Sequence, residues 1–134
     1  LLKNICKQKG AAVMLITHDM GVIAETCDRV AVMYAGRIVE IGPVQQVIHQ
    51  PQHPYTVGLM ASIPDIENDR ERLNQIDGSM PRLNAIPAGC AFNPRCSQVF
   101  IKCKQAKPEL KTVDGLTRTE VACWLQSDLT RSTL

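Results

Sequence analysis

The sequence has few aromatic residues, no long apolar run and little net charge. Among its 134 residues are one Trp, two Tyr and two Phe, too few for the aromatic platform on which proteins stack nucleic-acid bases. No stretch approaches the roughly 20 apolar residues of a transmembrane helix, so any work at a membrane would be done through a partner. The formal net charge of +2 points to no particular partner. These absences argue against nucleic acid as a partner and against a membrane-spanning segment in this sequence.

Positions 13–19 read Val-Met-Leu-Ile-Thr-His-Asp, four apolar residues followed by three polar ones. This pattern predicts a buried parallel strand that ends in a functional loop. Ligands of open α/β sheets bind beyond the carboxyl ends of such strands, which makes Thr17, His18 and Asp19 candidate site residues. An imidazole suits chemistry near neutral pH, because modest changes in its surroundings switch its charge. The alternative is that the His-Asp pair only caps the helix that follows.

The segments around this loop alternate between helix and strand, as in an α/β fold. In order, we expect a helix ending at Gly10, the strand at 13–16, a helix over 21–27 capped by Asp19, strands at 29–34 and 37–42 joined at 35–36, and a helix over 44–49. A single parallel strand lacks the neighbouring strands that it requires. The first helix also begins without a capping residue. We therefore expect the chain to be a fragment that starts near the end of a larger domain.

Residues 15–42 resemble the end of an ABC transporter ATPase domain. The resemblance rests on Leu-Ile-Thr-His-Asp at 15–19 and on the hairpin sequence at 28–42. It implies that His18 is the switch histidine, which hydrogen-bonds the γ-phosphate of ATP and helps to position the attacking water when two ATPase domains close. This role is physically reasonable, because phosphoryl transfer is catalysed mostly by positioning and charge stabilisation. The resemblance also implies ATP and Mg²⁺ as cofactors.

A phosphate-binding loop of the form G-x-x-x-x-G-K-S/T does not occur in the 134 residues, and neither do the family's Walker B strand, Gln loop and signature motif. In the family these motifs lie upstream of the segment seen here. We therefore expect a C-terminal fragment of a P-loop ATPase domain. The fragment alone would be inactive, whereas its parent subunit would be an ATPase.

Residues 51–56, Pro-Gln-His-Pro-Tyr-Thr, resemble a segment typical of ATPases from the dipeptide, oligopeptide and nickel importer branch. Read alone, His53 is a turn or cap residue, and a helix is expected over 55–62. The resemblance implies that the segment joins the ATPase core to an added C-terminal extension. The expected division is 1–49 for the end of the ATPase domain, 50–77 for a connecting helix and charged linker, and 78–134 for a small irregular Cys-rich extension.

Four of the six cysteines, Cys90, Cys96, Cys103 and Cys123, follow the spacing C-x5-C-x6-C-x19-C in the C-terminal part. A cross-link can replace a core in such a segment, and zinc, two disulfides and an iron–sulfur cluster compete for that role. Zinc commonly uses a closer cysteine pair than this spacing offers. Disulfides suit secreted chains, and four widely spaced thiolates suit iron. Cys6 and Cys27 fall outside the set.

The cysteine segment also resembles the extension of the peptide-importer branch. The shared features are Gly-Cys-x-Phe-x-Pro-Arg-Cys at 89–96, a third cysteine, and Val-Ala-Cys at 121–123. Some of these ATPases carry a 4Fe–4S cluster. The resemblance therefore implies such a cluster on the four cysteines, with zinc as the alternative.

The resemblance as a whole implies the ATP-binding subunit of an ABC importer of peptides, peripheral at the cytoplasmic face of the cell membrane. It implies three kinds of partner: a second ATPase subunit, transmembrane permease subunits and, indirectly, an extracytoplasmic peptide-binding protein. Dipeptides, oligopeptides, nickel and glutathione stay open as substrates. The alternative function is a metal-binding redox, regulatory or structural module without catalysis of its own.

Overall fold

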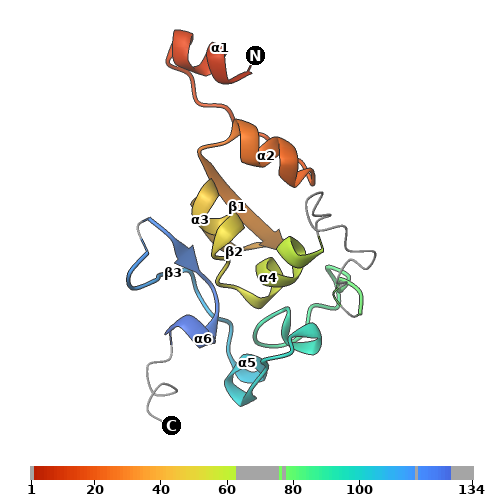
Figure 1. Ribbon diagram of the computed structural model, residues 1–134. Helices are drawn as coiled ribbons and strands as arrows, with labels where there is room; N and C mark the ends of the chain where they lie inside the picture. Colours follow the sequence, from red (N-terminus) through yellow and green to blue (C-terminus); the bar gives the residue numbers. More distant parts are fainter. Residues whose placement is uncertain (1, 63–75, 77, 117, 128–134) are drawn as a thin grey trace.

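The computed structural model describes residues 2–62, 76, 78–116 and 118–127 (Figure 1). The elements in order are α1 (Leu2–Lys9), α2 (Met20–Thr26), β1 (Arg29–Tyr34), β2 (Arg37–Pro43), α3 (Val44–His49), α4 (Pro54–Ala61), the 3-10 turn η1 (Asn93–Arg95), α5 (Ile101–Gln105), β3 (Lys111–Thr112), β4 (Glu120–Val121) and α6 (Trp124–Ser127). None of the helices in these ranges has the length and apolar character needed to cross a membrane. Most of the predicted charged linker lies outside the described residues.

β1 and β2 form the antiparallel hairpin that the sequence predicts. Their pairing runs from Arg29 with Pro43 to Tyr34 with Arg37. The turn residues Ala35 and Gly36 have φ angles of 50° and 82°. Positive φ at both positions is what a two-residue turn needs to match the right-handed twist of the strands. The predicted helices on either side of the hairpin are confirmed as α2 and α3, with bounds within a residue of those expected.

Two short strands from the far end of the chain complete the sheet. The strand order is β1-β2-β4-β3, and every neighbouring pair is antiparallel. Val121 pairs with Glu40, and the next residue, Ala122, donates its N–H to the Val39 carbonyl at 2.8 Å. The sheet therefore joins the hairpin to the strand β4, which ends two residues before Cys123.

The predicted parallel strand at 13–16 is wrong for this structure. The segment between α1 and α2 makes no strand pairing, and Figure 1 shows it as an extended link that sets α1 apart from the sheet. Met14 and Ile16 are 88% and 90% exposed. A parallel strand needs partner strands beside it and cover on both faces, and the described part of the chain supplies neither to this segment. The described residues form helices and one antiparallel sheet. The expectation of a chain that combines helices and strands is therefore confirmed, whereas the expected parallel strand is not found among them.

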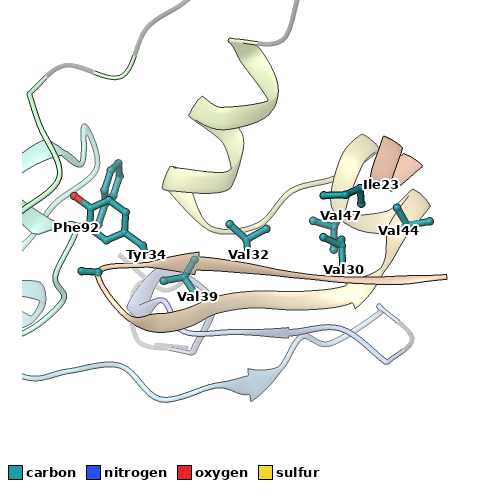
Figure 2. Packing of buried hydrophobic residues seen from close by; sticks show 9 residues of the cluster. Ile23, Val30, Val32, Tyr34, Val39, Val44, Val47 and Phe92 are labelled. Atoms are coloured by element: carbon teal, nitrogen blue, oxygen red, sulfur yellow. The ribbon is translucent and has the colours of Figure 1, made fainter. Parts of the chain in front are cut away.

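The hydrophobic core follows the hairpin from one end to the other (Figure 2). Its labelled members are Ile23, Val30, Val44 and Val47 at the end covered by α2 and α3, Val32 and Val39 in the middle, and Tyr34 and Phe92 at the opposite end. Side chains of α4, including Tyr55 and Leu59, pack against this cluster. Phe92 belongs to residues 89–103, here called the cysteine segment, so the core anchors that segment directly to the hairpin.

Candidate functional site

His18 lies in the exposed loop that precedes α2. The Asp19 carboxylate caps this helix by accepting the N–H groups of Gly21 at 3.0 Å and Val22 at 3.3 Å. The Thr17 hydroxyl in turn accepts the Asp19 N–H at 3.1 Å. The predicted capping role of Asp19 is confirmed. The loop presents His18 to solvent between two residues that fix the turn, and its catalytic role stays a prediction.

The four cysteines predicted as ligands line one small cavity, although they come from separate elements. Cys90 and Cys96 lie on either side of η1, Cys103 lies on α5, and Cys123 precedes α6. The cavity has a volume of about 10 Å³. Its other walls include His53, Pro54, Phe92, Asn93, Trp124 and Leu125. None of the six cysteines, all of which are described, forms a disulfide, and Cys6 and Cys27 do not border this cavity.

Backbone contacts hold Cys90 against Cys103. The Cys90 N–H donates to the Cys103 carbonyl at 2.7 Å. Gly89 turns there with a φ of 76°, and a Cβ at this position would overlap the same carbonyl. The side-chain Nδ2 of Asn93 lies 2.8 Å from the Ala88 carbonyl oxygen, 2.9 Å from that of Cys90 and 3.4 Å from that of Cys103. Because only glycine tolerates this angle and this approach, the position of Cys90 depends on Gly89.

Burial changes the acidity of two of these thiols. Burial is the largest cause that raises the pKa of Cys90, against a smaller lowering by the Phe92 N–H. Burial also raises the pKa of Cys123 to about 11. In both cases the other cysteines of the cavity raise the pKa further, because neighbouring thiolates repel. The thiolate is the form that binds metals, so a bound cation would have to supply the charge that stabilises it.

His53 lines the same cavity and is 1% exposed. Its Nδ1 accepts the Tyr55 N–H at 3.0 Å and so caps α4, which confirms the predicted cap role. The other ring nitrogen, Nε2, is buried without a hydrogen-bond partner in the described structure. Burial lowers the pKa of His53 to about 4. A buried donor left unpaired costs about 1–3 kcal/mol, so this ring is placed at an energetic cost.

Glu40 fastens the His53 segment to β2. It is fully buried, and its carboxylate accepts the Gln52 N–H at 3.0 and 3.1 Å and the His53 N–H at 2.8 Å. Burial raises the pKa of Glu40 and outweighs these backbone donors, which lower it. The sequence does not single out Glu40, since polar positions of an alternating strand are expected to face water. Only the tertiary structure shows residues 52–56 covering that position.

Aromatic contacts tie the cysteine segment to the rest of the molecule. The Phe92 ring centroid lies 5.2 Å from that of Tyr34, 5.5 Å from that of Tyr55 and 5.9 Å from that of His53. Arg95 in the same segment donates from Nη1 to the Tyr34 hydroxyl at 3.1 Å. Aromatic pairs at these separations are worth about 0.5–1.5 kcal/mol beyond the area that they bury. One wall of the cavity is therefore continuous with the main core.

Comparison with known proteins finds one matching family. Residues 39–103 match the family described as the oligopeptide/dipeptide transporter, C-terminal region. The matched residues include Glu40, His53 and three of the four cavity cysteines, while Cys123 follows them.

Individual relatives agree with this family. The chain is 44% identical to the dipeptide transport ATP-binding protein DppD of Bacillus subtilis, over 94% of the chain and 37% of the relative. It is 45% identical to the oligopeptide transport ATP-binding protein AppD of the same organism, over 84% of the chain and 34% of the relative. It is 42% identical to the oligopeptide transport ATP-binding protein OppD of Haemophilus influenzae, over 96% of the chain and 39% of the relative. The chain thus spans a little over a third of the length of these relatives.

Proposed function

We propose that the chain is the C-terminal part of an ATP-binding, ATP-hydrolysing subunit that energises an ABC importer of peptides. The observation that carries this proposal is its similarity, over most of its length, to three proteins named for ATP binding in oligopeptide or dipeptide transport. ATP and Mg²⁺ are the cofactors of such a subunit. Its partners are a second ATPase subunit and transmembrane permease subunits, and its place is the cytoplasmic face of the membrane. The alternative, a redox or regulatory module without catalysis, receives no support from these relatives.

Within this function, His18 is the residue that acts on the γ-phosphate. Its side chain is exposed in the loop before α2, where a nucleotide held by other parts of the subunit can reach it. Asp19 and Thr17 fix the turn around it through hydrogen bonds to backbone N–H groups. Because the turn is already fixed, the His18 imidazole needs little reorganisation before it donates a hydrogen bond to the γ-phosphate. Donors that are positioned in advance stabilise the charge that develops in the transition state.

The test is ATP hydrolysis by a subunit that carries both this chain and a phosphate-binding loop, assembled with its permease subunits. His18→Ala should lower ATP turnover by about 100- to 1,000-fold, the usual effect of losing one positioned donor, and should leave nucleotide binding largely intact. His49→Ala is the matched control, because His49 is also exposed but lies on α3. A parallel loss of binding and turnover in His18→Ala would contradict the assignment.

We further infer that Cys90, Cys96, Cys103 and Cys123 hold a 4Fe–4S cluster, with zinc as the alternative. The support is the donor set, four sulfur side chains brought to one cavity from separate elements, since soft sulfur ligands suit iron. Among the described residues, no three His, Cys, Asp or Glu side chains stand close enough to hold a single metal ion. Tetrahedral zinc would need sulfurs roughly 3.8 Å apart, given a Zn–S distance of about 2.3 Å.

The size of the cavity adds a requirement to this inference. A volume of about 10 Å³ admits one water-sized body, so the cysteine side chains must turn outward or the loops must separate around a cluster. When bound, such a group supplies a cross-link between the loops, and its binding free energy adds to their folding. Iron, inorganic sulfide and zinc contents of protein purified without oxygen distinguish the cluster from zinc. Protein with neither metal would contradict both.

A further inference from the structure

The cavity between the four cysteines contains a hydrogen-bond donor that the protein itself does not use. His53 lines the cavity, is 1% exposed, and keeps its Nε2 without a partner in the described structure. Because Nδ1 accepts the Tyr55 N–H at 3.0 Å, it cannot carry a proton. The single proton of the neutral ring therefore lies on Nε2, which is a donor and not an acceptor.

The ring of His53 is held in place from both sides. The Glu40 carboxylate accepts the His53 backbone N–H at 2.8 Å, and the Nδ1 bond to Tyr55 fixes one edge of the ring. The ring also lies beside that of Phe92, with centroids 5.9 Å apart and the two planes tilted by 56°. Turning Nε2 out to water would break the cap of α4. These contacts therefore keep Nε2–H at the cavity.

Two other side-chain N–H donors at the cavity already have acceptors. The Trp124 Nε1 donates to the Ala106 carbonyl at 2.9 Å, and the Asn93 amide lies within hydrogen-bonding distance of three backbone carbonyls. The rest of the lining is sulfur from the cysteines, Gln98, and apolar carbon from residues such as Phe92 and Leu125. In the described structure none of these groups accepts a hydrogen bond from Nε2. Buried donors in proteins are nearly always hydrogen-bonded, so we expect the acceptor of Nε2–H to belong to a group that binds in the cavity.

We propose that His53 is a positioning residue of the four-cysteine site, whose Nε2–H donates a hydrogen bond to a thiolate or inorganic sulfur of the group bound there. The proposal rests on the inferred iron–sulfur site. Hydrogen bonds to the sulfurs of a cluster are among the factors that set its reduction potential. Since a donor stabilises the more negatively charged, reduced form, the His53 hydrogen bond raises that potential. The residue thus has two separate uses, with Nδ1 capping α4 and Nε2 serving the site.

Two substitutions separate these uses. His53→Asn places a side-chain oxygen near the position of Nδ1, keeps the cap with a residue favoured there, and removes the Nε2–H. His53→Gln does the reverse, because its longer side chain can bring an N–H to the position of Nε2 while losing the cap acceptor. The intact protein and both variants are purified without oxygen. Iron and sulfide contents, reduction potential and unfolding free energy are then measured for each.

We expect His53→Asn to keep the iron and sulfide content of the wild type and to shift the reduction potential to more negative values. His53→Gln should keep the potential close to that of the wild type and be less stable. Equal potentials in the wild type and His53→Asn would overturn the role of Nε2 while leaving the cluster in place. Wild-type protein without iron and sulfide would overturn the cluster and this proposal together, and would leave the ATPase proposal to its own test.

A measurement on the wild type keeps the proposal falsifiable if neither variant folds. Pulsed electron paramagnetic resonance of the reduced protein, labelled with ¹⁵N-histidine, should detect a weak coupling from a histidine nitrogen. The chain has three histidines, and His18 and His49 are exposed and do not line the cavity. Absence of any histidine coupling would overturn the proposal.

Discussion

Replacing Glu40 by alanine should loosen the joint between the hairpin and the His53 segment. The substitution removes the acceptor of two backbone N–H groups, those of Gln52 and His53. Each buried donor left unpaired costs about 1–3 kcal/mol. Relief from burying the carboxylate, whose pKa burial raises, offsets part of this cost. We expect the free energy of unfolding to fall by about 2–4 kcal/mol.

Denaturant unfolding and amide hydrogen exchange test this expectation together. The amides of Gln52 and His53 should lose protection in Glu40→Ala, because they lose their acceptor. Glu40→Gln keeps one side-chain oxygen and should lie between the wild type and Glu40→Ala. Glu109→Ala, at an exposed glutamate, is the control and should change stability by less than about 0.5 kcal/mol. A change in Glu40→Ala no larger than the control, or protection unchanged at both amides, would refute the reasoning.

Two further predictions follow from the geometry of the cavity. In the first, metal-free wild-type protein is compared with metal-free His53→Asn between pH 7 and pH 4. The free energy of unfolding of the wild type should fall by about 3 kcal/mol more than that of the variant, because His53 takes up a proton at the ordinary histidine pKa near 6.5 in the unfolded chain but only at about 4 in the folded chain. Equal pH slopes of the two proteins in denaturant titrations would count against it. Gly89→Ala should lose stability and its bound metal, because the new Cβ overlaps the Cys103 carbonyl, whereas Gly115→Ala has a similar positive φ of 84° but open space around it. Similar stability and metal content in these two variants would show that the close approach at Gly89 has no effect.

Local signals in the sequence predict the elements whose interactions are local. The hairpin follows from alternating residues on either side of Ala35-Gly36, and the start of α2 follows from Asp19, because turn and cap chemistry depends on neighbours a few residues away. The strand at 13–16 could not be judged in this way. Its apolar run predicts burial, but burial requires other strands, and the described part of the chain does not provide them.

The candidate site likewise combines features that local sequence predicts with features that only the folded chain shows. The resemblance singles out the four cysteines as a set, but their spacing alone does not place them around one cavity, since Cys123 is brought there by the pairing of β4 with β2. Glu40 and His53 lie 13 positions apart and meet only in the folded chain. No local pattern indicates that either is buried. The cap role of His53 could be read from the sequence, whereas its place at the cavity could not.

The most direct test of this account is the metal content of six single cysteine variants, purified without oxygen and compared with the wild type. If the four side chains, which line one cavity, hold the proposed cluster together, serine at Cys90, Cys96, Cys103 or Cys123 should each remove the bound iron and sulfide and make the C-terminal part sensitive to protease. Serine at Cys6 or Cys27, which do not border the cavity, should do neither. If Cys27→Ser lost the metal while Cys103→Ser kept it, or if no variant and no wild-type protein held metal, the four-cysteine site would be contradicted.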